Sequence, residues 1–185
     1  LATGVLCQQA RAEDIPARVA LARTWQQVVG NDRVLETLTS RGTRAFVAGR
    51  AGYPIADDVP GRPEVLLAEG EVPSAFVGPR VAVVGTRAAT PHGLADAHEI
   101  GVALGEAGVT VVSGLALGID AAAHRGALEG GGRAIGVVAT GLDVVYPRRH
   151  AALFRAVREA GLLVSELGYG SQPRPGAFPV RNRII

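Results

Sequence analysis

Two short stretches that contain glycine have the residue types and the spacing of a phosphate-binding site. Gly85, Thr86 and Arg87 follow the apolar residues 81–84, and the stretch SGLALG follows the apolar residues 109–112. Glycine lets the backbone approach a phosphate closely because it has no Cβ atom, and a helix that starts after such a turn offers unpaired N–H groups. An arginine in the first stretch can hold a phosphate with two hydrogen bonds.

The elements around these stretches predict that they lie side by side. We expect strands at residues 81–84 and 109–112, joined by a helix with Thr90 as its N-cap, Pro91 at its first position and Gly108 as its C-cap. In an open parallel sheet both stretches then fall at the carboxyl edge of the strands, where ligands bind. The predicted phosphate-binding residues are Gly85, Thr86, Arg87, Ser113, Gly114 and Gly118. The alternative is that the glycines only form tight turns and that the arginine is solvated.

The same alternation of strand and helix continues along the chain. Further strands are predicted at residues 134–139 and 162–165, with helices at residues 119–128 and 150–160. Strands that alternate with helices of this length indicate an α/β fold with a parallel sheet. We place a Rossmann-like domain at residues 44–185, with extra strand candidates near its start.

The first part of the chain has a different pattern. Residues 1–43 are predicted to form a small helical segment of two short helices separated by Gly30, with Trp25 as a packing anchor. The chain starts at Leu1 rather than Met, so we expect that something has been cut away upstream. We place the domain boundary near Thr43.

Composition excludes several classes of protein. The sequence has no apolar run of the roughly 18 residues that a membrane span requires and no signal peptide, so we expect a cytoplasmic protein without membrane contact. The single cysteine, Cys7, excludes an intramolecular disulfide and a cysteine metal cluster. The formal net charge of the chain is only +2, but residues 146–185 hold seven Arg and two Glu, a basic field that attracts a polyanion.

Cofactor-dependent chemistry is not indicated. The stretch GTRAAT lacks the glycine spacing of a dinucleotide-binding loop, and the absence of lysine excludes a Walker A loop, so we expect no cofactor. Ser113, Asp120 and His124 could suggest a hydrolase, but no nucleophile elbow is present and an acid at a helix start is explained by the helix dipole. The histidines lack metal-ligand spacing, so we expect no metal and no catalytic residue.

Five motifs in this order resemble the DNA-processing protein A (DprA/Smf) family: GTRAATPHG, SGLALGIDAAAHRGAL, GLDVVYP, SELGYG and FPVRNRII. The resemblance covers roughly residues 52–185. It implies an extended Rossmann-like domain with an open, mostly parallel sheet and helices on both faces. It also implies that the protein binds single-stranded DNA without sequence preference, forms a homodimer, protects incoming strands in natural transformation and helps to load the RecA recombinase.

The resemblance extends the predicted site. By motif, Arg87 matches a DNA-contacting arginine, and we add the basic or polar residues Arg148, Arg149, Arg181, Asn182 and Arg183. His150 stands where the family usually has Asn, and the chain ends where family members continue, so we expect a domain that is incomplete at its C-terminus. Few aromatic residues are expected near the site, so stacking on bases should matter little.

One enzyme remains as an alternative. A nucleotide N-glycosidase of the lysine-decarboxylase-like type shares the glycine-loop architecture, but its proline-diglycine motif is missing here. We therefore expect a DNA-binding protein that is not an enzyme. Release of free base from nucleoside monophosphates would favour the alternative.

Overall fold

The computed structural model describes residues 38, 40–56, 58–70 and 73–185. The predicted helical segment at residues 1–43 lies almost entirely outside the described residues, as do Cys7 and Trp25. The domain boundary near Thr43 therefore stays a prediction.

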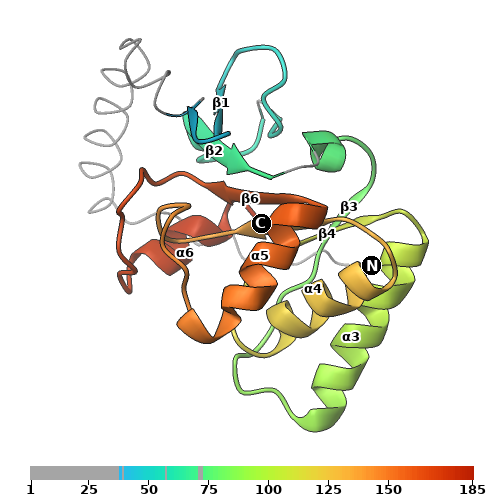
Figure 1. The fold of residues 1–185 in the computed structure, drawn as a ribbon. Helices are drawn as coiled ribbons and strands as arrows, with labels where there is room; N and C mark the ends of the chain where they lie inside the picture. Colours follow the sequence, from blue (N-terminus) through green and yellow to red (C-terminus); the bar gives the residue numbers. More distant parts are fainter. Residues whose placement is uncertain (1–37, 39, 57, 71–72) are drawn as a thin grey trace.

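One mixed sheet of six strands organises the described part of the chain (Figure 1), in the order β1-β2-β6-β5-β4-β3. Strands β3 to β6 are parallel, whereas β2 pairs antiparallel with both β1 and β6. The strands are β1 (Arg44–Val47), β2 (Val65–Glu69), β3 (Arg80–Ala82), β4 (Thr110–Ser113), β5 (Ala134–Val137) and β6 (Leu162–Ser165). The order places the carboxyl ends of β3, β4 and β5 next to one another, as the α/β prediction requires.

All the strands predicted from the sequence are present, although two are shorter than expected. β3 is an exposed edge strand of three residues, and the amide of Val83 still donates to the carbonyl of Val112 at 3.0 Å. β5 ends at Val137, but the amide of Val138 continues the pairing with a 2.8 Å bond to the carbonyl of Val164. Both strands therefore deliver their loops to the same edge of the sheet.

The helices begin and end close to where the sequence places them. They are α3 (Pro91–Glu106), α4 (Ile119–Glu129), α5 (Ala151–Ala160) and the short α6 (Ala177–Asn182), with 3-10 turns η2 (Pro73–Phe76) and η3 (Arg148–His150). The Thr90 side chain accepts a hydrogen bond from the amide of Gly93 at 3.1 Å, which confirms the predicted N-cap.

The two faces of the sheet are covered differently. Helices α3, α4 and α5 lie together on one side (Figure 1), where buried side chains of α4 and α5 such as Ala121 and Phe154 pack with Leu163 of β6. A second apolar cluster lies on the other face, where η2 and the C-terminal Ile184 and Ile185 cover Val112, Ile135 and Val164. The α/β class and Rossmann-like sheet are confirmed, with this second face covered in the described residues by η2 and loop segments rather than by long helices.

Glycines let α3 and α4 approach until their backbones touch. A Cβ atom built on Gly126 would lie 2.0 Å from the carbonyl oxygen of His98, and one on Gly101 would lie 2.3 Å from that of Ala123. Larger residues at either position would push the two helices apart. Because α4 starts at the second glycine loop, this packing also fixes the position of the site.

We expect Gly126→Ala to lower the free energy of unfolding by about 1–3 kcal/mol, because the added methyl group meets backbone atoms that cannot rotate away. Gly93→Ala is the matched control, since its Cβ would have ordinary contacts and alanine favours the helix by up to about 1 kcal/mol. Urea denaturation of both variants measures the difference. Equal stability of the two variants would contradict the proposed close packing.

Candidate nucleic-acid interface

Asp120 joins the two glycine-containing loops. It lies in the first turn of α4 and is only 5% exposed. One carboxylate oxygen accepts from the amide of Gly85 at 3.4 Å, and the other accepts from the amides of Gly114 at 3.1 Å and Ala116 at 3.4 Å. The Asp120 carboxylate therefore accepts hydrogen bonds from amides of both loops, and these amides are not available to a ligand.

This arrangement corrects one prediction. The amides of Gly85 and Gly114 were expected to bind phosphate, but the structure commits them to Asp120. The Ser113 hydroxyl is equally committed, since it is fully buried and donates to the carbonyl of Val83 at 2.6 Å. These residues build the two loops rather than present donors to a ligand.

The two loops are also in direct backbone contact. Gly118 has a φ of +79°, and a Cβ atom there would lie 2.1 Å from the carbonyl oxygen of Thr86. That carbonyl accepts from the amide of Ile119 at 3.3 Å. Position 118 requires glycine because φ is positive there and because the Thr86 carbonyl lies too close for a side chain. This close contact holds Arg87 beside the second loop.

Arg181 is a buried arginine that fastens α6 to the sheet edge. The residue is 6% exposed, and its guanidinium donates to the carbonyl oxygens of Gly114, at 2.8 Å, and Val137. Its Nε donates to the side chain of Asn182 at 3.1 Å. Burial lowers the pKa of Arg181, and the charge of Asp120 opposes this shift. Arg181 and Asn182 were expected to contact DNA; the structure uses Arg181 to hold α6 against the ends of β4 and β5.

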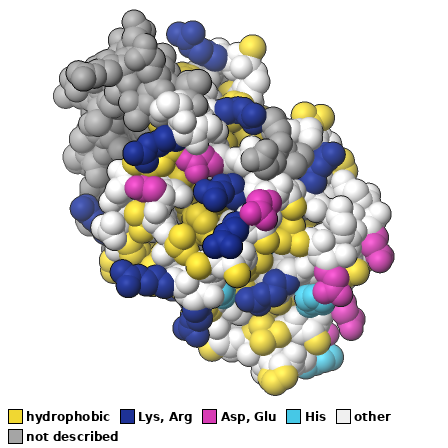
Figure 2. Space-filling model, in the orientation of Figure 1, with side chains coloured by type: hydrophobic (Ala, Val, Ile, Leu, Met, Phe, Trp, Pro, Cys, Tyr) yellow, Lys and Arg dark blue, Asp and Glu magenta, His cyan; other side chains and the backbone are white. Residues whose placement is uncertain are grey.

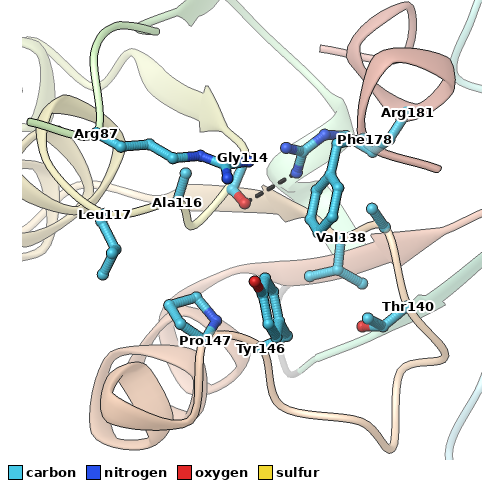
Figure 3. Close-up of a pocket in the computed structure, with 11 residues that line it drawn as sticks. Arg87, Gly114, Ala116, Leu117, Val138, Thr140, Tyr146, Pro147, Phe178 and Arg181 are labelled. Carbon is cyan, nitrogen blue, oxygen red and sulfur yellow. Dashed lines mark hydrogen bonds between the residues drawn. The ribbon is translucent and has the colours of Figure 1, made fainter. Parts of the chain in front are cut away.

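Two aromatic rings and an arginine meet at the mouth of the site. The ring centroids of Tyr146 and Phe178 lie 5.5 Å apart, and the guanidinium carbon of Arg87 lies 5.1 Å from the centroid of Phe178. Figure 3 shows the three side chains reaching into one pocket from three different segments. Two aromatic residues, Tyr146 and Phe178, line the pocket, so aromatic faces are present at the site although the sequence holds few such residues.

The rest of the pocket is mostly apolar. Its other lining residues are Gly114, Ala116, Leu117, Val138, Ala139, Thr140, Pro147 and Arg181. These residues come from the loops that follow β4 and β5 and from α6 (Figure 3), so the pocket opens at the carboxyl edge of the sheet. An apolar floor with aromatic walls and an exposed guanidinium suits a planar group that is attached to an anion.

The remaining predicted arginines fall into two groups. Arg148 and Arg149 are exposed in η3, directly after the pocket residue Pro147. Arg183 instead donates to Glu166 at 2.5 Å and to the carbonyl of Gly61, so its charge is paired. Arginine side chains are spread over the face seen in Figure 2, where some acidic side chains lie among them and others gather at the lower right.

A sequence model of the DNA recombination-mediator protein A family matches residues 45–185, well over half of the chain. The chain belongs to this family. The resemblance inferred from the five motifs is thereby confirmed. Protein Smf from Synechocystis is 50% identical over 107 residues, which cover 58% of this chain and 27% of that protein.

Two solved structures of family members share the fold. DNA processing protein A from Streptococcus pneumoniae has a TM-score of 0.70 and 36% identity, covering 80% of this chain and 53% of that one. The protein from Helicobacter pylori, whose structure was described for its single-stranded DNA binding mode, has a TM-score of 0.66 and 27% identity, covering 77% and 64%. The chain thus spans less than two thirds of the length of each of these relatives.

Two buried histidines support the site in this family member. His150 is buried and donates from Nδ1 to the carbonyl of Leu115 at 3.0 Å. His124 in α4 is fully buried, with Nε2 at 3.2 Å from the carbonyl of Ile135 and Nδ1 without a partner among the described residues. Neither ring faces Ser113, whose hydroxyl is donated elsewhere, so the three residues do not form a hydrolase site.

The buried His124 makes stability depend on pH. Burial lowers the pKa of His124 from 6.5 to about 4, an effect that the neighbouring Asp120 opposes and His150 reinforces. Because the folded state resists protonation, stability is full above pH 6.5 and should fall, by about 3 kcal/mol in total, between pH 6.5 and 4. We expect His124→Gln to flatten this part of the profile of unfolding free energy against pH. An unchanged profile would assign the effect to other groups.

The described part of the chain contains no group of three or more His, Cys, Asp or Glu side chains placed to hold a metal ion. It also contains no helix that is both long and apolar enough to span a bilayer.

Proposed function

We propose that this chain binds single-stranded DNA and acts in DNA processing. The observation that carries the proposal is the group formed by Arg87, Phe178 and Tyr146 at the mouth of the pocket. Unstacked bases bind to aromatic faces, and a guanidinium binds the phosphates between them. The likeness to a Helicobacter pylori protein described for its single-stranded DNA binding mode supports the proposal.

In the proposed complex, arginines contact the phosphates and aromatic rings contact the bases. Arg87 is exposed beside the Phe178 ring, and the exposed Arg148 and Arg149 follow the pocket along the chain, so these three supply phosphate contacts. The rings of Phe178 and Tyr146 supply base contacts. Phosphate contacts and stacking carry little base information, so binding is independent of sequence. Duplex DNA is disfavoured because its bases are already stacked on one another.

Family membership and the motif resemblance support a wider role as part of the proposal. On this basis the protein protects incoming single strands in natural transformation, helps to load the RecA recombinase and acts in the cytoplasm as a homodimer. No catalytic step and no cofactor form part of the proposal. The Ser113 hydroxyl donates to a backbone carbonyl and the Asp120 carboxylate accepts from backbone amides, so neither supports a hydrolase. The missing proline-diglycine motif leaves the N-glycosidase alternative without a supporting observation.

Anisotropy titrations with oligothymidine and with a duplex of equal length test the proposal. We expect clear preference for the single strand and an affinity that falls as salt is raised, with a log–log slope of about −0.7 per phosphate contacted. Oligoadenosine should bind similarly to oligothymidine. Equal binding to single strand and duplex would leave only a nonspecific basic surface.

A further inference from the structure

The two aromatic rings of the pocket belong to loops that follow different strands. Tyr146 lies in the loop after β5, and Phe178 lies in α6, at the end of the loop after β6. The Tyr146 ring is carried by irregular structure, whereas Phe178 is held with α6 by the hydrogen bonds of Arg181. The separation of the two rings therefore depends on where the loop that carries Tyr146 lies against the segment that follows β6.

The contacts between this loop and that segment form a continuous set of hydrogen bonds. The Asp143 carboxylate accepts from the amide of Gly170 with both oxygens, at 2.8 and 3.1 Å. The amide of Gly141 donates to the carbonyl of Ser171 at 2.9 Å. At the base of the loops, the Ser165 hydroxyl donates to the carbonyl of Thr140 at 2.7 Å.

Gly141 lets the two loops come this close. A Cβ atom at Gly141 would lie 2.6 Å from a carboxylate oxygen of Asp143 and 2.7 Å from the carbonyl oxygen of Gly168. It would also lie 3.0 Å from the amide nitrogen of Gly170, which is one of the donors of the loop contact. Any side chain at Gly141 would separate the loops where Asp143 holds them.

The negative charge of Asp143 is unfavourable for the binding of DNA phosphates at this place. The residue is exposed, it lies three residues before Tyr146, and it repels the phosphates of any strand in the pocket. Its two hydrogen bonds to Gly170 are local, and their local result is the spacing of the two loops.

We propose that Asp143 is a positioning residue that, with Gly141, sets how the Tyr146 ring lies against the Phe178 ring, so that the two rings in contact form one surface on which a base stacks. This inference rests on the proposed function and adds to it the group that controls base stacking. Asp143 does not touch the DNA. It acts through Gly170, which fixes the course of the chain toward α6, and through its own loop, which carries Tyr146.

The test separates base contacts from phosphate contacts. Affinity is measured for oligothymidine and for an abasic oligonucleotide of the same length, which carries the same phosphates. The ratio of the two affinities reports stacking alone, and it cancels the gain in phosphate attraction that follows from removing a negative charge. For the wild-type chain we expect a ratio of at least about fivefold.

Four variants make the test specific. Asp143→Ala and Gly141→Ala should reduce the ratio to less than about twofold while leaving the salt slope for the abasic strand unchanged. Asp143→Asn should retain most of the ratio, because its amide oxygen still accepts from Gly170. Glu106→Gln is the control for charge, since it removes one negative charge at the C-terminal end of α3, at the other edge of the sheet. It should leave the ratio unchanged.

The outcomes distinguish the two levels of the proposal. Failure of the wild-type chain to bind oligothymidine would remove the proposed function itself. A wild-type ratio near one, or ratios in Asp143→Ala and Gly141→Ala equal to the wild-type ratio, would overturn only the role of Asp143. A loss of ratio in Asp143→Ala that Asp143→Asn restores would support it.

Discussion

Replacing Asp120 by Asn is expected to lower the free energy of unfolding by about 3 kcal/mol, a large part of the stability of a small domain. The two carboxylate oxygens accept from three amides in two loops. An asparagine has only one side-chain oxygen, so it can accept from the amides of one loop only. The buried guanidinium of Arg181 would also lose the opposing charge that favours its protonated form. Both effects act against the folded state.

Thermal and urea unfolding measure this loss, with Asp96→Asn as the matched control. Asp96 is an exposed acid on α3 whose removal should change stability by no more than about 0.5 kcal/mol. Oligothymidine binding by Asp120→Asn should weaken as well, since the loop that carries Arg87 is no longer tied to α4. If Asp120→Asn is as stable as Asp96→Asn, the carboxylate does not hold the loops together.

Replacing Arg87 by Ala is expected to weaken oligothymidine binding by a factor of about 10 to 100, the range for loss of a hydrogen-bonded charge. Arg87 is exposed, and it contacts the Phe178 ring at the mouth of the pocket. The variant therefore loses a phosphate contact and one side of the stacking group. The salt slope should fall in magnitude by about 0.7.

Arg133→Ala is the control for Arg87→Ala. Arg133 is exposed directly before β5, at the amino edge of the sheet, so its removal changes the net charge equally without touching the pocket. It should leave the salt slope unchanged. Equal effects of the two substitutions would mean that overall charge, rather than this pocket, binds the DNA.

The order of the elements could be predicted from local signals. Thr90 and Pro91 fix the start of α3, and Gly108 marks its end, because caps depend on a few neighbouring residues. The alternation of apolar strands with helices predicts the parallel part of the sheet for the same reason. The antiparallel addition of β1 and β2 could not be predicted, since pairing partners depend on contacts far apart in the chain.

The site was predicted only in outline. The two glycine-containing loops lie together and Arg87 lines the pocket, as expected. The sequence does not show that Asp120 fills the amides between the loops, because that depends on how α4 enters the sheet edge. The sequence also does not show that Arg181 is buried whereas other arginines are exposed. Phe178 lines the pocket only because α6 folds back onto the sheet, which local sequence signals do not predict.

The carboxylate of Asp120 has a consequence for which molecules can compete for the pocket. In many α/β proteins the place it occupies receives the phosphate of a single nucleotide, with several amides directed at one ligand. Here the amides of Gly85, Gly114 and Ala116 already donate to Asp120, so a lone nucleotide that reaches the two rings and the Arg87 guanidinium lacks these three donors. On the proposed function, affinity must then be gathered from many weak contacts repeated along a polymer. Free nucleotides should therefore bind much more weakly than a strand, and affinity should increase with the length of the strand.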